Sequence, residues 1–391
     1  MFKLLPLDYP MRNLGRRPTQ TLLTIVACAL VAGVIVATVS FASGLEKSFA
    51  DQGRSDTAIL ISNSATRDIV RSSISPAVAD LAAADIASIR KVHGRACVSP
   101  EIQMGTNVTL GDDLAVPPRV YAAFVRGVTD RAFLVHENLT LTEGRLPGPG
   151  EAIVGRLVAA RFGVDPERVA IGKKVRLEGG EFEISGVFAA PGTTIESEIW
   201  APLHELMGLA RREDISAVFL RVSDPADLDD IDVFAQRRLD LGLLYIPSKT
   251  YYGDLAAYFA PIRGLAWLMA LMIAVTVVFT GANTLNTSVQ DRINELATLR
   301  ALGYPGRSLA LALLVEALLL TATGGLAGLL LAHLAMDGLA FRIGMGAFSL
   351  DVGAAAVLVG FLSVLFLGLC GTLPAAFRVL RLPVAVALKD D

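Results

Sequence analysis

Few side chains in this sequence are of the kinds that perform chemistry, and those few are widely spaced. The histidines lie apart from one another, at His93, His136, His204 and His333. No H-E-x-x-H pair occurs, and the phosphate-binding loop G-x-x-x-x-G-K-[ST] is also absent. We therefore expect no catalytic residue, no metal site and no ATP bound in that manner on this chain.

Glu316 is the one strong acid inside a long apolar run, Ser308 to Met336. An acid within a membrane span is a candidate for function, because a charge in lipid is costly. A proton relay is one interpretation. Because Glu316 follows Arg307 by only about two helical turns, we favour a structural or coupling role near the end of a span.

A second pattern lies in the polar interval before that run. Spacings of three and four residues place one set of side chains on a single helical face: Arg292, Glu295, Leu299 and Leu302. Gly303 is predicted to end this helix. Two interpretations remain open, because such a helix could dock a protein partner or lie on lipid headgroups.

Two adjacent glycines, Gly324 and Gly325, lie about one helical turn before Gly328 in the same apolar run. Small residues at this spacing let helices approach closely in a membrane. They could instead face lipid, but we favour close packing within the chain or between subunits.

The elements that carry these residues are indicated by the distribution of apolar residues. The mean hydropathy of the 391 residues is +0.54. Four runs exceed the roughly 20 residues that a bilayer-spanning helix needs, and we expect transmembrane helices at 19–45, 262–290, 308–336 and 352–377. The first run could be a cleaved signal peptide, but it is longer than the roughly 7–15 apolar residues of such a leader.

A large domain is predicted between the first and second of these helices, at 46–261. From Gly44 to Pro261 the chain holds 23 Lys and Arg against 30 Asp and Glu, the balance of a solvated domain. Cys97 is its only cysteine; the others, Cys28 and Cys370, lie in apolar runs, so no disulfide is expected within the domain. Helix and strand signals are mixed, which predicts an α+β fold.

Several segments of this domain carry specific signals. We expect strands at Thr57 to Ser62 and Val218 to Val222, and a hairpin around Gly179-Gly180. One helix should start at Ser75-Pro76 and end near Gly94, and a helix from Pro225 to Leu241 should lead back to the membrane.

The short flanking segments indicate the orientation. Lys and Arg exceed the acids in 1–18, in the loop 291–307 and in the tail 378–391, but not in the loop 337–351. Because positive flanks stay cytoplasmic, both termini are predicted inside, and the large domain and the loop 337–351 outside. The net charge of −3 gives no indication of nucleic-acid binding.

Several short motifs together resemble one family. The pattern R-x-x-E-x-x-x-L-R-x-L-G at 292–303, followed by an acid and then Gly-Gly-x-x-Gly, resembles the FtsX-like permeases of MacB-type (type VII) ABC transporters. Matching motifs occur along nearly the whole chain: Arg-Asn-Leu-Gly-Arg-Arg-Pro at 12–18, Glu-Gly-Arg-Leu-Pro at 143–147, Trp-Ala-Pro-Leu at 200–203, Asn-Thr-Leu at 283–285, and Pro374-Ala375 with Pro383 to Leu388.

The resemblance implies a polytopic α-helical protein of the bacterial cytoplasmic (inner) membrane, with four transmembrane helices and a large α+β extracytoplasmic domain between helices 1 and 2. It implies that the chain is a non-catalytic permease subunit. It also implies that this subunit forms a homodimer, or a heterodimer with a related permease. The macrolide exporter of the family carries its ATPase on the same chain; here a separate cytoplasmic ABC ATPase, which binds ATP and Mg, is expected. An extracytoplasmic adaptor protein and membrane lipids are further expected partners.

In this family, ATP hydrolysis is expected to move the outer domains, for export or extraction of a hydrophobic or lipid-like substrate. ATPase coupling would fall to Arg292, Glu295, Leu299, Arg300, Leu302 and Gly303. One rival is a cargo-free signalling scaffold that activates an extracytoplasmic enzyme such as a cell-wall hydrolase. An intramembrane enzyme or ion-coupled carrier would need more buried polar residues than Glu316 and His333 supply.

Overall fold

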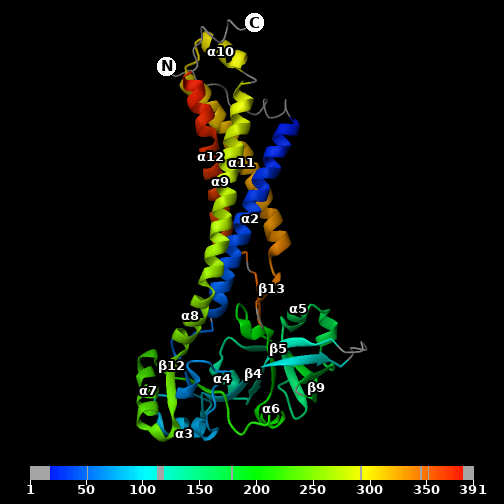
Figure 1. Ribbon diagram of the computed structural model, residues 1–391, viewed down its shortest axis with the longest axis vertical. Coiled ribbons are helices and arrows are strands. Elements are labelled where there is room, and N and C mark those ends of the chain that lie inside the picture. The colour runs from blue at the N-terminus through cyan, green and yellow to red at the C-terminus, as the bar shows by residue number, and fades with distance from the viewer. Residues whose placement is uncertain are drawn as a thin grey trace. The chain divides into compact units, whose positions relative to one another are not determined.

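The computed structural model describes residues 18–50, 52–111, 119–177, 179–290, 293–343, 346–350 and 352–381. These residues form two compact units (Figure 1). Of the described residues, the helical unit holds 18–43, 261–339 and 352–381, and the α/β unit holds those within 44–260 and 340–350. Three predicted features lie outside the described residues: the segment 1–17, Arg292 and the tail from 382.

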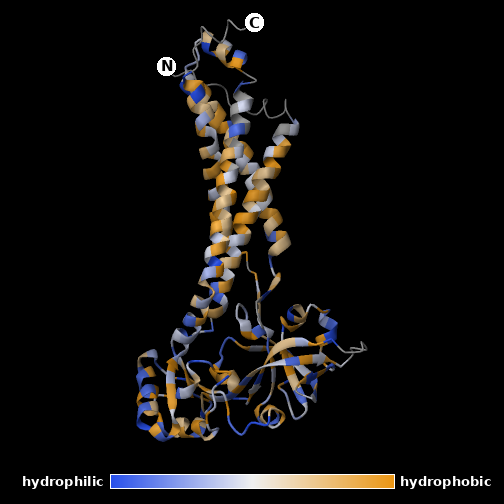
Figure 2. Ribbon diagram, viewed as in Figure 1, coloured by the Kyte–Doolittle hydropathy of each residue, from blue (hydrophilic) through white to orange (hydrophobic). Residues whose placement is uncertain are grey.

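The helical unit is built from four long apolar helices and one short one. They are α2 (Pro18–Ala50), α9 (Ala260–Gln290), α10 (Ile293–Ala301), α11 (Gly306–Met336) and α12 (Ala354–Leu380). The four long helices have the length and composition to cross a membrane, and Figure 2 shows the hydrophobic residues along them. The prediction of four membrane helices is thereby confirmed as four candidate spans. The last turns of α2, after Ser43, belong to the α/β unit.

The α/β unit is organised around a ten-stranded sheet in the order β12-β1-β11-β4-β5-β10-β7-β9-β6, with β8 paired to β4 and β9. Its strands are β1 (Thr57–Ser62), β4 (Val98–Leu110), β5 (Tyr121–Val128), β6 (Thr140–Gly144), β7 (Glu151–Gly155), β8 (Lys174–Leu177), β9 (Gly180–Ala189), β10 (Ile199–Pro202), β11 (Ala217–Arg221) and β12 (Leu243–Pro247).

The long strand β4 connects the two halves of this sheet. Its first residues, Val98 to Glu101, pair with β11, and the residues from Ile102 to Val108 pair with β5. Most pairs are antiparallel, but β10 runs parallel to β5 and β7 runs parallel to β9. Every residue of the neighbouring strands β10 and β11 is buried, so polar side chains there must be paired internally.

Short helices cover the sheet. They are α3 (Ala77–Asp85), α4 (Ala132–Val135), α5 (Val158–Phe162), α6 (Leu203–Leu209), α7 (Leu228–Arg237) and α8 (Ser248–Tyr258), with 3-10 turns η1 (Asn63–Ala65), η2 (Pro166–Val169), η3 (Thr194–Ser197), η4 (Pro225–Asp227) and η5 (Leu239–Leu241). The main core lies between the sheet and α3, α5, α6 and α7, and includes Val98, Ile102, Ile184 and Leu206. This confirms the predicted mixture of helices and strands.

Three local predictions were wrong. Helix α3 ends at Asp85, not near Gly94, because Ile86 is extended and the chain then forms the small hairpin β2 (Lys91–Val92) and β3 (Arg95–Ala96). The predicted helix from Pro225 to Leu241 is broken at Arg238. It does not lead back to the spans directly, since strand β12 pairs with β1 before α8 begins.

The segment between α11 and α12, predicted only as a loop, contains a hairpin. Its strands are β13 (Ala340–Ile343) and β14 (Gly346–Ser349), which pair antiparallel. Residues 340–350, here named the α11–α12 hairpin, pack within the α/β unit.

Candidate functional sites

Helix α10 packs on the helical unit through one apolar face. Leu296 is 4% exposed and Ala297 is fully buried. Leu296 belongs to a cluster with residues of α11 and α12: Leu309, Leu313, Ala375 and Val379. Arg300 adds a hydrogen bond from Nη1 to the carbonyl oxygen of Val379, at 3.4 Å. The short helix is therefore held by tertiary contacts, which an isolated helix of this length would need.

The opposite face of α10 is open to solvent. Glu295 and Thr298 are exposed, and Leu302 just after the helix is 65% exposed. Leu299 is different, because it is half-buried against the cluster that holds Leu296. The structure therefore separates residues that helical spacing alone places on one face: Glu295 and Leu302 face outward, whereas Leu299 contacts its own chain.

Gly303 ends this segment by a backbone conformation that other residues resist. Its φ angle is +93°. The amide of Gly303 donates to the carbonyl of Arg300 at 3.1 Å, and that of Tyr304 donates to the carbonyl of Leu299 at 3.2 Å. These bonds satisfy carbonyls at the end of the helix, as glycine-terminated helices commonly do. The predicted stop at Gly303 is confirmed.

The three glycines of α11 lie at helix contacts within the helical unit. A Cβ on Gly324 would lie 2.6 Å from the Cβ of Cys28 and 2.7 Å from the carbonyl oxygen of Ile25, both on α2. A Cβ on Gly328 would clash with the backbone of Ala29. Gly325 faces α12 instead, with ordinary 3.6 Å spacing to the nearest side chains. Glu316, on the same helix, is half-buried.

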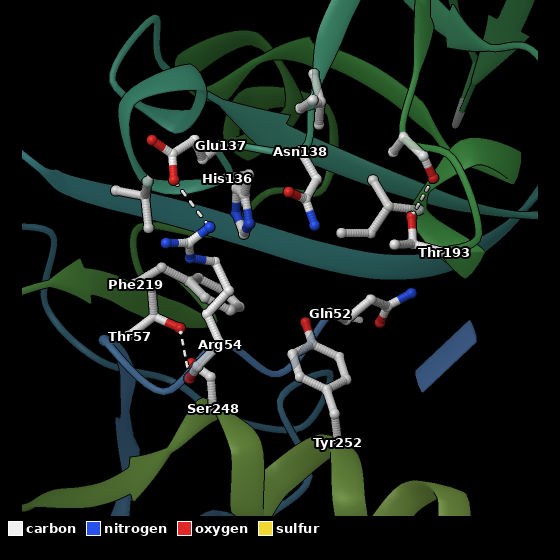
Figure 3. A pocket seen from close by; sticks show the side chains of 14 residues that line it. Gln52, Arg54, Thr57, His136, Glu137, Asn138, Thr193, Phe219, Ser248 and Tyr252 are labelled. Carbon is white, nitrogen blue, oxygen red and sulfur yellow. Dashed lines mark hydrogen bonds and ion pairs between the residues drawn. The ribbon is translucent and has the colours of Figure 1, made fainter. Parts of the chain in front are cut away.

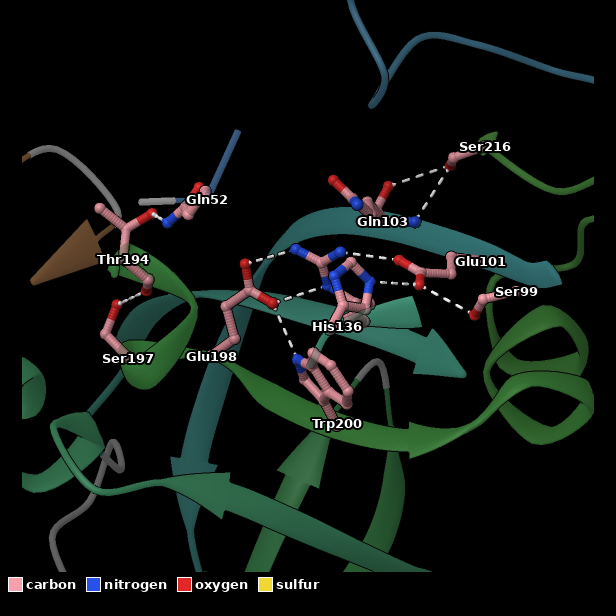
Figure 4. A network of polar contacts seen from close by, with 11 residues as sticks. Gln52, Ser99, Glu101, Gln103, His136, Thr194, Ser197, Glu198, Trp200 and Ser216 are labelled. Atoms are coloured by element: carbon pink, nitrogen blue, oxygen red, sulfur yellow. Dashed lines mark hydrogen bonds and ion pairs between the residues drawn. The ribbon is translucent and has the colours of Figure 1, made fainter. Parts of the chain in front are cut away.

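A cluster of charged side chains lies buried inside the α/β unit (Figure 4). Arg126, in β5, donates from Nε and Nη2 to the two carboxylate oxygens of Glu198 at 2.7 and 2.8 Å. Its Nη1 donates to Oε2 of Glu101, in β4, at 2.7 Å. His136 Nε2 lies 2.8 Å from the other oxygen of Glu101, and Trp200 Nε1 donates to Glu198 at 2.8 Å. The charged groups of the network are thus paired with other members of the network.

The electrostatics of this network favour its charged form. Burial alone would raise the pKa of Glu101, but the charges and hydrogen bonds of His136 and Arg126 outweigh it and lower that pKa to about 2. Burial likewise opposes the charge of Arg126, yet Glu198 and Glu101 raise the pKa of its guanidinium well above the usual value. A buried charge needs such partners, because an unpaired one costs several kcal/mol.

Sequence reasoning did not find this network. Its signal was available, since Arg126 interrupts the apolar strand Tyr-Ala-Ala-Phe-Val-Arg-Gly-Val at 121–128. A charge within a buried strand requires a partner. Which partner it has depends on strand register, because Arg126 lies opposite Gln103 in β4 and Trp200 in β10, beside the two glutamates.

One small cavity adjoins the network (Figure 3). Its lining includes His136, Asn138, Gln52, Arg54 and Tyr252 of α8. Its volume is about 30 Å³, enough for one or two water molecules and far below the roughly 300 Å³ of a ligand site. Among the described residues no group of three His, Cys, Asp or Glu could hold a metal ion. The side chains of the network are paired with one another, which suits it to fixing the fold.

Two family models match the sequence. The MacB-like periplasmic core domain matches residues 21–232, more than half of the chain, and the FtsX-like permease C-terminal domain matches residues 267–384. The chain belongs to the MacB- and FtsX-like permeases of ABC transporters. The resemblance found in its motifs is confirmed, and so is the fold of four candidate membrane helices with a large periplasmic domain between the first and second.

Two solved structures are similar to parts of this permease. One is the periplasmic region of MacB from Actinobacillus actinomycetemcomitans, at 13% identity and TM-score 0.39, covering 52% of this chain and 94% of the other. The other is the extracellular domain of the noncanonic ABC-type transporter YknZ from Gram-positive bacteria, at 14% identity and TM-score 0.36, covering 49% and 99%. No curated protein matches the sequence.

Membership of this family carries further consequences. It implies a non-catalytic subunit of an ABC transporter that has a cytoplasmic ATPase partner. Together with the four apolar helices it indicates a multi-pass protein of the inner membrane.

Proposed function

We propose that this permease couples ATP hydrolysis by a separate cytoplasmic ATPase to movement of its α/β unit. The observation that carries the proposal is α10, a short helix fixed by Leu296 on one face and exposing Glu295 and Leu302 on the other. A rigidly mounted helix can pass displacement of a docked protein into the helices beneath it. A helix that merely lay on lipid would not need that mounting.

The proposed cycle places chemistry and movement on different chains. ATP and Mg bind the partner ATPase, and the permease supplies the docking face, the spans and the α/β unit. Two copies, or one copy and a related permease, would present two such faces to a pair of ATPases. The cavity beside the buried network of the α/β unit is too small for a ligand. We propose export or extraction of a hydrophobic or lipid-like substrate, with an adaptor as a further partner.

The test is made on the full chain, tagged and purified from membranes of its own host. We expect an ATP-hydrolysing subunit to co-purify, with a rate of Mg-ATP hydrolysis that falls at least tenfold in the Leu302→Asp variant. Hydrolysis unchanged by that substitution would contradict the docking assignment. Substrate is sought by comparing lipids released to the outer face with and without ATP. ATP-dependent activation of a cell-wall hydrolase without lipid release would favour a signalling scaffold instead.

A further inference from the structure

The α11–α12 hairpin is covalently part of the connection between two spans, yet it is built into the α/β unit. Three of its side chains are almost fully buried there: Ala347, Phe348 and Leu350 are each 1% exposed. A short loop that only reverses the chain between two helices has no need of such burial. The α/β unit is therefore attached to the helical unit not only through α2 and α9 but also through the ends of α11 and α12.

Polar contacts fix the hairpin at both of its strands. The amide of Ala347 in β14 donates to Oγ of Ser197 at 2.9 Å. Arg342 in β13 donates from Nε to the carbonyl oxygen of Ala160 at 2.8 Å. The guanidinium also lies against Gly163, whose φ of +69° and missing side chain leave room for it. These bonds join the hairpin to η3 on one side and to α5 on the other.

The segment that follows α2 also contacts η3. Gln52 donates from Nε2 to Oγ1 of Thr194 at 2.6 Å, and Figure 4 shows the two side chains together. Farther back, Gly44 lies beside Phe348, with a Cβ there only 3.0 Å from the ring. The turn η3 thus contacts both the exit from α2, through Thr194, and the hairpin, through Ser197.

The turn η3 is itself firmly held in the sheet. The amide of Leu157 donates to the carbonyl of Glu196 at 2.9 Å, and Gly155 passes so close to Glu196 that it has no space for a side chain. The Glu196 carboxylate is buried and paired with Arg156 at 3.0 Å. Two residues later Glu198 joins the buried network of Arg126. A displacement applied at η3 therefore reaches the centre of the sheet through short, stiff contacts.

We propose that the α11–α12 hairpin is a second mechanical tether, which transmits movement of α11 and α12 into the α/β unit through η3. This inference rests on the proposed function, since it needs ATP-driven movement of the spans. The hairpin remains docked on η3 throughout the cycle. The hairpin and the residues that follow α2 both act on η3. The α/β unit therefore moves with all four spans together and not with α2 and α9 alone.

Docking is tested first, without any ATPase. In a full chain whose native cysteines Cys28, Cys97 and Cys370 are replaced by alanine, Ser197→Cys and Ala347→Cys should cross-link almost completely under mild oxidation. In the wild type, amides of 340–350 should exchange with solvent at least tenfold more slowly than in a variant with Gly-Ser residues at all eleven positions. Failure of the cysteines to cross-link, together with fast exchange in the wild type, would overturn the tether irrespective of any partner.

Transmission is tested next in the complex with the co-purified ATPase. Spin labels on cysteines introduced at Ser223 of the α/β unit and Leu334 of α11, both exposed, report the distance between the units with and without ATP. We expect an ATP-dependent shift in the wild type and in the control Arg237→Ala, an exposed arginine on α7. The Gly-Ser variant and the double variant Arg342→Ala/Ser197→Ala should lose most of it.

Three results separate the inference from the proposed function. Loss of the shift with ATPase binding and hydrolysis retained supports the tether. A full shift in the Gly-Ser variant overturns the tether and leaves the proposed function standing. No shift in the wild type, despite ATP hydrolysis, overturns the proposed movement and with it the transmitting role, whatever the cross-link shows.

Discussion

Arg126 and Glu198 form a two-pronged ion pair inside the α/β unit, with Nε and Nη2 of the arginine 2.7 and 2.8 Å from the two carboxylate oxygens. The arginine side chain is 4% exposed. It also lies 5.3 Å from the ring centroid of Trp200. Because β5 and β10 are parallel neighbours, this pair fastens the strand that follows η3 to the middle of the sheet.

Breaking this pair should destabilise the α/β unit strongly. Arg126→Met leaves the carboxylates of Glu101 and Glu198 buried without their guanidinium, and removing one partner of a buried ion pair typically costs about 3–5 kcal/mol. Thermal unfolding of the full chain in detergent, followed by Trp200 fluorescence in a Trp267→Phe background, should show a large fall in Tm. The control Arg237→Ala, at an exposed site, should change Tm little. Equal Tm values would mean that the network contributes no net stability.

Acid should weaken the α/β unit through Glu101. Its pKa is about 2 in the folded chain against an ordinary 4.5, so the unfolded state binds the proton first and stability rises with pH across that interval. The contribution is complete above about pH 5 and is lost progressively as the pH falls from about 4.5 toward 2. The same Trp200 measurement should show a Tm that falls over this range. Glu101→Gln should be less stable at pH 7 and less sensitive to acid; an unchanged slope would contradict the assignment.

Two matched substitutions test the helix contacts of α11. Gly328→Ala places a methyl group against the backbone of Ala29, whereas Gly325→Ala places one at 3.6 Å from Phe361 and Val364. Overpacking typically costs about 1–3 kcal/mol, and alanine otherwise favours a helix over glycine. We expect circular dichroism to show a lower helix-melting temperature for Gly328→Ala and an unchanged one for Gly325→Ala. An unchanged melting temperature for Gly328→Ala would show that Gly328 is not required for close approach.

The orientation predicted from flanking charges can be measured by labelling. In a chain without native cysteines, Asp130→Cys and Thr298→Cys place single reactive groups at exposed positions of the α/β unit and of α10. A membrane-impermeant maleimide added to intact spheroplasts should label position 130 but not position 298. After lysis, both should react. Labelling of 298 in intact spheroplasts would reverse the predicted topology.

Much of the fold follows from the sequence because the spans and tight turns have local causes. A membrane helix must be apolar along its whole length, and Gly303 and Gly179 occupy positive φ angles that favour glycine. The division between Leu299 and Leu302 has no local cause. Helical spacing groups them, and only the packing of α10 on α11 and α12 decides which is covered. The buried partners of Arg126 are likewise fixed by strand register, which single residues do not reveal.

The difference in exposure between Leu302 and Leu299 defines the sharpest test of the docking face. Leu302 is 65% exposed, and Glu295 is exposed as well. Leu302→Asp should therefore leave the helical unit folded but prevent burial of the residue 302 side chain in the ATPase. Burying a leucine is worth roughly 1.5–3 kcal/mol, and a charge in that place adds a desolvation cost. We expect at least a tenfold loss of ATPase co-purification, at normal membrane level and Tm, and a smaller loss for Glu295→Arg.

The controls separate docking from folding. Leu239→Asp makes the same change at an 82% exposed leucine of the α/β unit and should leave ATPase binding intact. Leu299→Asp should instead lower the Tm of the helical unit, because Leu299 packs on the cluster of Leu296 and Leu309. If Leu302→Asp and Glu295→Arg both retained the ATPase, α10 would not be its docking surface. If Leu299→Asp lost the ATPase at unchanged Tm, Leu299 rather than Leu302 would be the residue that enters the partner.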